Sequence, residues 1–192
     1  MPSTNTIFRN ASIYDGEGNE FSETDLLIKD GKIIAMGTDL PGSPEFIEVD
    51  ASGKWITPGI IDIHSHMGVY SAPSVSSSSD GNESTSPITA DVWAEHSIWT
   101  QDPQFVLALK GGVTTFHVLP GSANLIGGRG VTAKNLQRNT INSMKFPNAP
   151  HTLKMACGEN PKRVYGNRKQ APSTRMGNIA GYRKAWIEAE SY

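Results

Sequence analysis

One short stretch constrains the fold of this 192-residue chain more than any other, the run Pro58–His66. The middle of this run is apolar apart from Asp62, which predicts a short strand buried on both faces. His64 and His66 follow at the end of that strand. Because side chains alternate along a strand, residues two apart point the same way, so the two imidazoles aim at one point. Converging imidazoles are a geometry that a metal ion needs.

The same spacing has a plainer explanation, a histidine pair that hydrogen-bonds to nearby carbonyl groups. Spacing alone leaves both explanations open, because a metal site needs three or more ligands. Asp62 lies two residues before His64 and therefore shares its face. We expect Asp62 either to orient a ligand histidine or to hold neighbouring backbone.

Upstream of this stretch, residues 1–57 predict a small β-structure. Two apolar runs, Leu26–Ile28 and Ile33–Met36, flank the turn Lys29–Lys32. That turn contains Asp-Gly, a strong hairpin signal. A sheet of about three to five short strands is marginal alone and needs something to pack against. We therefore expect an N-terminal β domain at 1–57 and a second domain at 58–192.

Residues 67–101 are polar, rich in serine and unpatterned. They are typical of a flexible linker. They are equally typical of a long loop that covers a site, because they leave directly from the histidine strand.

From residue 102 onward, strands alternate with helices. The expected elements are a helix at 103–110, a strand at 113–119, a glycine-rich loop at 121–130, a helix at 135–144, a strand at 153–157 and a helix at 173–190. Strand–helix alternation predicts parallel pairing with helical crossovers. About three β/α units fit after residue 58, whereas a closed (β/α)8 barrel takes about 250 residues. The sequence therefore predicts an α/β fold, either a three-stranded open sheet or the first part of a barrel.

Three further polar residues in this region are candidates for a site. Glu159 follows the third strand and is either a metal-reaching carboxylate or a solvated loop charge. Lys154 lies in that strand, where a lysine is costly unless it is used or partnered. His117 is expected to be packed or hydrogen-bonded rather than a ligand. The loop 121–130 has the glycines to wrap an anion with backbone N–H groups, but it lacks the ending of a nucleotide-binding loop.

Composition excludes several classes of function. With 17 Lys and Arg against 19 Asp and Glu, the net charge is -2, which gives no pull toward nucleic acid or membranes. The one cysteine rules out an intramolecular disulfide and a thiolate metal cluster. No signal peptide is visible, so the chain as sequenced is predicted to be cytoplasmic, with a periplasmic or secreted parent left open.

Taken together, the motifs resemble a known family. Pro58–His66 resembles the first barrel strand of the amidohydrolase superfamily, and more closely that of the imidazolonepropionase-related amidohydrolases. The resemblance covers essentially the whole chain. The other similar segments are Ile28–Ile33, Asp50–Lys54, Gly111–Thr115, Cys157–Gly166 and Thr174–Gly177.

The resemblance implies an incomplete (β/α)8 TIM-type barrel, of about its first three β/α units, preceded by a small β-sandwich segment. It also implies a metal-dependent hydrolase that cleaves non-peptide carbon–nitrogen bonds, in amides or cyclic amides of a small-molecule substrate, with metal-activated water. Zinc is the first expectation, as one or two ions, with other transition metals as alternatives. His64 and His66 would be metal ligands, and Asp62 would be a carboxylate that orients a ligand histidine without binding the metal itself. Glu159 is the first candidate for a bridging ligand, and Lys154, carboxylated, is the second.

One departure from the family is large. Its later histidines and its aspartate base come from later strands, so this chain is predicted to be an N-terminal portion that is inactive alone. The alternative is a catalytically inactive remnant, or an assembly half that needs a complementary barrel chain. Either a homo-oligomer or that complementary chain is the expected protein partner.

Overall fold

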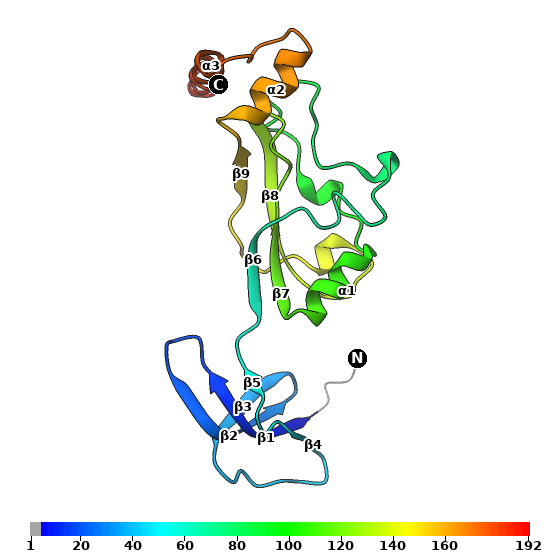
Figure 1. The fold of residues 1–192 in the computed structure, drawn as a ribbon, viewed down its shortest axis with the longest axis vertical. Helices are drawn as coiled ribbons and strands as arrows, with labels where there is room; N and C mark the ends of the chain where they lie inside the picture. Colours follow the sequence, from blue (N-terminus) through cyan, green and yellow to red (C-terminus); the bar gives the residue numbers. More distant parts are fainter. Residues whose placement is uncertain (1–4) are drawn as a thin grey trace. The chain divides into compact units, whose positions relative to one another are not determined.

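The computed structural model describes residues 5–192, and the chain forms two compact units, Met1–Pro58 and Gly59–Tyr192 (Figure 1). The first unit is one five-stranded sheet in the order β3-β2-β1-β4, with β5 also paired to β1. Its strands are β1 (Thr6–Tyr14), β2 (Glu20–Lys29), β3 (Lys32–Gly37), β4 (Ile47–Asp50) and β5 (Trp55–Ile56). A β-sandwich is a finer description than this single sheet supports, and it stays a prediction.

The hairpin predicted in the first unit is confirmed. Strands β2 and β3 pair antiparallel, with Lys29 opposite Lys32. Asp30 and Gly31 at the turn both have positive φ, of 51° and 73°. This backbone twist matches that of the flanking strands, which is why Asp-Gly favours the two-residue hairpin.

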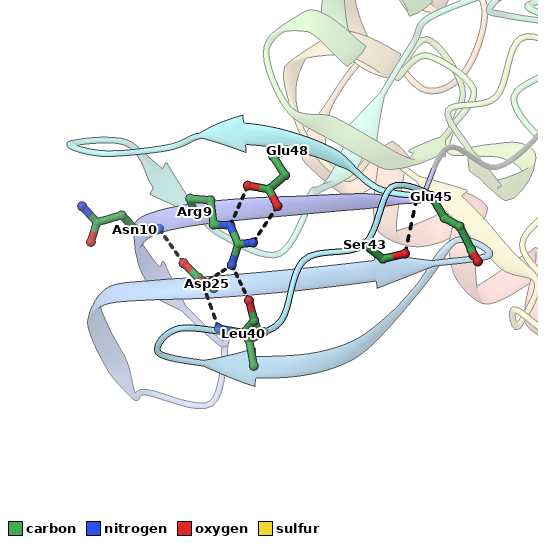
Figure 2. A network of polar contacts seen from close by, with 7 residues as sticks. All are labelled: Arg9, Asn10, Asp25, Leu40, Ser43, Glu45 and Glu48. Carbon is green, nitrogen blue, oxygen red and sulfur yellow. Dashed lines mark hydrogen bonds and ion pairs between the residues drawn. The ribbon is translucent and has the colours of Figure 1, made fainter.

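One arginine ties the strands of the first unit together (Figure 2). Arg9 on β1 donates to the Asp25 carboxylate at 2.7 Å and to the Leu40 carbonyl at 2.6 Å. It also reaches both oxygens of Glu48, at 2.7 and 3.1 Å. Asp25, only 6% exposed, accepts backbone N–H groups of Asn10 and Leu40 as well. Burial alone would raise the pKa of Asp25, but these hydrogen bonds outweigh it and lower the pKa.

The second unit is an α/β fold whose sheet makes a curled half-barrel in the order β6-β7-β8-β9. Its strands are β6 (Ile60–Ser65), β7 (Val113–Val118), β8 (Ile126–Lys134) and β9 (Thr152–Met155). Its helices are α1 (Pro103–Lys110), α2 (Glu159–Asn167) and α3 (Arg175–Glu190), with short 3-10 turns η1 (Ser76–Ser78), η2 (Ala94–His96) and η3 (Ile141–Ser143). The predicted α1, β7, β9 and α3 are confirmed within a few residues.

The strand directions differ from the predicted all-parallel pattern. β6 and β7 are parallel, but β8 is antiparallel to both β7 and β9. β6, β7 and β9 therefore run one way, with β8 inserted between them in the opposite direction. The glycine-rich loop predicted at 121–130 is wrong from Ile126 onward, because β8 begins there.

Close packing explains why glycines lie in this strand. A Cβ on Gly128, whose φ is +107°, would come within 2.5 Å of the Val92 carbonyl oxygen. Glycine in β8 thus marks a close backbone approach rather than a loop.

The predictions for two helices also fail. No helix forms at 135–144, where only the short turn η3 lies. Helix α2 was not predicted, because Pro161 and Gly166 interrupt its pattern. Pro161 lies in the first helical turn, where proline is tolerated because the first N–H groups have no partner within the helix.

The core of the second unit lies where α1 covers the sheet. Phe105 of α1 stacks on Phe116 of β7, with ring centroids 5.0 Å apart. Asp102 caps α1 by accepting the Gln104 N–H at 3.0 Å, as its position before Pro103 predicts. Since Phe116 faces α1, the neighbouring His117 faces the opposite side of the sheet.

The serine-rich segment 67–101 is held against the rest of the second unit. The buried Asn124 amide donates to the carbonyls of Glu83 and Ser86, at 2.6 and 2.8 Å. The Tyr165 hydroxyl on α2 donates to the same Ser86 carbonyl at 2.6 Å. These contacts favour the structured-loop interpretation over the flexible linker.

In the part of the chain from residue 5 to the end, no helix combines the length and the apolar character that crossing a membrane requires.

Candidate functional site

The histidine pair lies at the end of β6. His64 is within the strand and His66 follows it directly. Their ring centroids are 5.3 Å apart in an edge-to-face arrangement. The structure thus brings the two predicted ligands side by side.

A carbonyl group fixes the tautomer of His66. Its Nδ1 lies 2.8 Å from the carbonyl oxygen of Leu119, at the end of β7. A carbonyl only accepts, so Nδ1 carries the proton and Nε2 presents a lone pair. This hydrogen bond is the kind that orients imidazoles in metal sites.

Lys154 is the neighbour of His64, although 90 residues separate them in the sequence. Its Nζ lies 3.2 Å from His64 Nε2. The positive charge of Lys154, then burial and the nearby His66, lower the pKa of His64. Burial also lowers the pKa of Lys154 itself. Both groups are therefore biased toward their neutral forms, which are those that can donate a lone pair.

Asp62 contacts backbone in this structure. Its Oδ1 accepts the N–H of His64 at 3.1 Å. This is the second of the two expectations for Asp62, and its place behind a ligand histidine stays a prediction.

His117 is hydrogen-bonded at both ring nitrogens. Its Nδ1 lies 2.8 Å from the Thr132 hydroxyl and its Nε2 lies 2.7 Å from the Thr152 hydroxyl. Burial, with a smaller part from His64, lowers its pKa. The ring is therefore an internal brace between β7, β8 and β9, as the hydrogen-bonded alternative predicts.

Glu159 is the first residue of α2. Its carboxylate pairs with Lys162 at 3.1 Å, and its side chain is 72% exposed. Within residues 5–192, no three His, Cys, Asp or Glu side chains are grouped closely enough to hold a metal ion. The structure therefore groups His64 and His66 with Lys154 and does not group Glu159 with them. The ligand roles of these residues stay predictions.

The donor set fits a divalent metal in kind. Two imidazoles suit zinc and similar transition metals. The two histidines alone do not complete a coordination shell, because structural and catalytic zinc sites use at least three protein ligands. Any complete site needs a further donor beside this pair.

A pocket of about 340 Å³ opens beside His66. Its walls come from the serine-rich segment 67–101, the β7–β8 connection and α2. Its lining residues are His66, Tyr70, Asn82, Gly121, Ser122, Ala123, Asn160, Arg163 and Val164. No sequence pattern marks Asn160 and Arg163 as site residues, because Pro161 and Gly166 interrupt the pattern of the helix that carries them.

Two amidohydrolases align with nearly the whole chain. The chain is 35% identical to "Amidohydrolase tasK" of Hapsidospora irregularis over 210 residues, which cover 96% of this chain and 21% of that protein. It is 40% identical to the solved structure of an amidohydrolase from Thermotoga maritima, with a TM-score of 0.86 and coverage of 97% of this chain and 48% of that one. No family model matches the chain.

A shorter similarity, of 39% identity over 61 residues, is to a dihydroorotase of Lactobacillus helveticus and covers 32% of this chain and 13% of that protein. The chain thus spans about a fifth of tasK and about half of the T. maritima protein.

Proposed function

The chain belongs to the amidohydrolase superfamily, and we propose that it supplies the first metal ligands of a hydrolase acting on non-peptide carbon–nitrogen bonds. The observation that carries the proposal is the histidine pair itself. Its rings lie together at a strand end, and the Leu119 carbonyl fixes one of them so that its Nε2 presents a lone pair. Small amides and cyclic amides are the proposed substrates.

In this proposal His64 and His66 hold a divalent metal, with zinc as the first choice and one or two ions bound. The metal would supply a water of lowered pKa and would polarise the carbonyl of the substrate. His66 is oriented by Leu119, and the charge of the nearby Lys154 lowers the pKa of His64.

Lys154 replaces Glu159 as the preferred third ligand. Its Nζ is 3.2 Å from His64 Nε2, whereas the Glu159 carboxylate pairs with Lys162. When a neutral lysine amine adds dissolved carbon dioxide, a nitrogen–carbon bond forms and one proton leaves the nitrogen for solvent. The resulting carbamate supplies two oxygen donors. The lowered pKa of Lys154 favours the neutral amine that this addition requires.

A chimera tests the proposal. This chain would replace the matching half of the T. maritima amidohydrolase, and the product would be assayed for bound metal and for hydrolysis of a panel of amides, lactams and cyclic imides. We expect bound divalent metal and hydrolysis, with both lost in the His64→Ala/His66→Ala double variant. His151→Ala is the matched control, because His151 is an exposed histidine outside the pair. Hydrolysis that survives the double replacement would refute the proposal.

The edge of the sheet favours a second candidate role, that of an assembly half. β6 is the end strand of its sheet and pairs only with β7 among the described strands. Ile61 and Ile63 on it are 62% and 78% exposed. An apolar edge strand of this kind is a template for another strand.

For this role we infer that a complementary barrel segment pairs with β6, in place of a second copy of this chain. The T. maritima relative is about twice as long as the part this chain matches, which is why a complementary segment is the chosen occupant. Co-expression with the unmatched half of that relative, followed by size-exclusion chromatography, tests it. A 1:1 complex that Ile61→Lys abolishes is expected. A homodimer formed by the chain alone, or no complex, would contradict it.

A further inference from the structure

The pocket beside His66 has a polar, positively charged wall. Arg163 and Asn160 of α2 line it, and so does Ser122 from the β7–β8 connection. No carboxylate is among its lining residues, within the part of the chain that the structure describes. The pocket therefore presents hydrogen-bond donors and positive charge toward whatever enters it.

Arg163 is the group that dominates this wall. Among residues 5–192, its one polar contact is a long one, from Nη2 to the Asn160 side-chain oxygen at 3.4 Å. The neighbouring cations, Lys162 on α2 and Arg168 directly after it, are engaged. Lys162 pairs with Glu159, and Arg168 bonds to Ser84 while its guanidinium lies over the Tyr165 ring. Arg163 thus keeps most of its five N–H donors for a ligand.

The rest of the pocket is held in place by its own hydrogen bonds. Asn160 donates to the Ser122 hydroxyl at 2.6 Å. Asn82 accepts the Ala123 N–H at 3.0 Å and donates to the Tyr70 hydroxyl. Gly121 lies so close to Asn82 that any side chain there would collide with it. The walls are therefore built before a ligand arrives, which lowers the entropic cost of binding.

Helix α2 is itself fixed. Tyr165 and Pro161 are buried, and the Asn178 amide of α3 donates to the carbonyls of Cys157 and Gly158, both at 3.1 Å. These two residues precede α2 directly. Arg163 is therefore presented from a rigid element rather than from a loop.

We propose that Arg163 binds a carboxylate of the substrate, so that the substrate of this site is a small amide or lactam that carries an acidic group. The inference rests on the proposed function, because it takes His66, on the same pocket, as the reaction end. A planar guanidinium holds a carboxylate through two parallel hydrogen bonds, which orients as well as binds it. The pocket volume of about 340 Å³ limits the substrate to a compact molecule.

Binding to the intact chain tests the inference without requiring turnover. The two probes are 5-oxoproline, a lactam with a carboxylate, and its carboxamide, a neutral molecule of the same shape. Isothermal titration calorimetry or ligand-observed NMR gives both affinities. We expect the carboxylate to bind at least about tenfold more tightly, as charge-assisted hydrogen bonds imply.

Two matched variants assign the preference to Arg163. Arg163→Gln should erase the difference between the probes. Arg138→Gln removes the same charge from an exposed arginine outside the pocket and should preserve it. Equal affinity of the wild-type chain for both probes, no saturable binding of the carboxylate, or an unchanged preference in Arg163→Gln would overturn the inference. Tighter binding of inorganic phosphate than of 5-oxoproline would also overturn it, because Arg163 would then prefer a phosphate group to a carboxylate.

Zinc titration of the same samples separates this inference from the proposed function. A carboxylate preference in a chain that binds no zinc would leave the Arg163 subsite standing while the metal-dependent hydrolase fails. Zinc binding at His64 and His66 without any carboxylate preference would support the metal site and overturn the Arg163 subsite.

Discussion

The two polar clusters of this protein, one around Arg9 and one around Lys154, surround their charged groups with opposite kinds of neighbour. In the first unit, Arg9 lies between two carboxylates and a carbonyl, and the nearly buried Asp25 accepts three donors. In the second unit, the half-buried Lys154 has a histidine as its hydrogen-bonding neighbour. The first arrangement lowers the pKa of an acid and the second lowers the pKa values of two bases.

This difference indicates what each cluster is for. A buried charge with matched partners stabilises the fold only as long as all partners stay. A lysine placed beside imidazoles without a carboxylate has a cost in stability, and such a cost is typical of functional sites. We therefore assign the Arg9 cluster to structure and the Lys154 cluster to chemistry, and four predictions test this contrast.

Removing Asp25 is expected to have the largest effect. Asp25→Ala leaves Arg9 without its most buried partner and two backbone N–H groups without their acceptor. The expected loss is about 2–3 kcal/mol in the free energy of unfolding. Hydrogen exchange of the amides in β1 and β2 reports it locally. Glu48→Gln is the control and should cost much less, because Glu48 is exposed.

The stability of the first unit should fall in acid through the same residue. The folded-state pKa of Asp25 is lower than its usual value of 3.8. Its contribution is therefore fully present above pH 3.8 and is lost as the pH falls through the lower folded-state pKa. Urea denaturation from pH 6 to pH 2 should show this loss in the wild type and a flatter profile in Asp25→Asn. Parallel profiles would show that Asp25 does not carry the effect.

Replacing Lys154 should act in the opposite direction. Lys154→Met keeps the aliphatic length and removes the charge from a half-buried position. We expect the free energy of unfolding to stay unchanged or to rise by up to about 1 kcal/mol, since solvent still screens this group. A loss as large as that of Asp25→Ala would mean that Lys154 is structural, and it would break the contrast.

The same variant should change the titration of His64. The charge of Lys154 is the largest cause of the lowered pKa of His64. Lys154→Met should therefore raise that pKa toward its usual value of 6.5. NMR titration of the His64 ring measures it, with the exposed His151 ring as an internal reference. An unmoved His64 pKa would show that burial, not Lys154, sets it.

Local patterns predicted much of this fold. The Asp-Gly hairpin, the capped α1 and the long α3 all follow from short-range signals that the structure confirms. The histidine strand forms as predicted, but its predicted burial on both faces is wrong, because Ile61 and Ile63 on this end strand of the sheet are 62% and 78% exposed. The similarity to amidohydrolases could also be inferred from the motif around His64. These features depend on neighbours within a few residues, which a sequence displays directly.

Features that depend on tertiary contacts could not be predicted. β8 contains glycines that normally indicate a loop, and only the close approach of residues such as Val92 explains them. Lys154 lies beside His64 although β7 and β8 separate their two strands in the sheet, and no pattern in the sequence signals this approach. Arg163 could not be predicted as a site residue for a local reason, since Pro161 interrupts the helical pattern of α2.

The central claim is that His64 and His66 hold a metal ion together. Zinc titration by calorimetry, with cobalt absorption as a second readout, tests it most directly on the intact chain. We expect saturable binding that either His64→Ala or His66→Ala weakens at least about tenfold, and that His151→Ala leaves unchanged. Equal zinc binding in all four proteins, or none in the wild type, would contradict it.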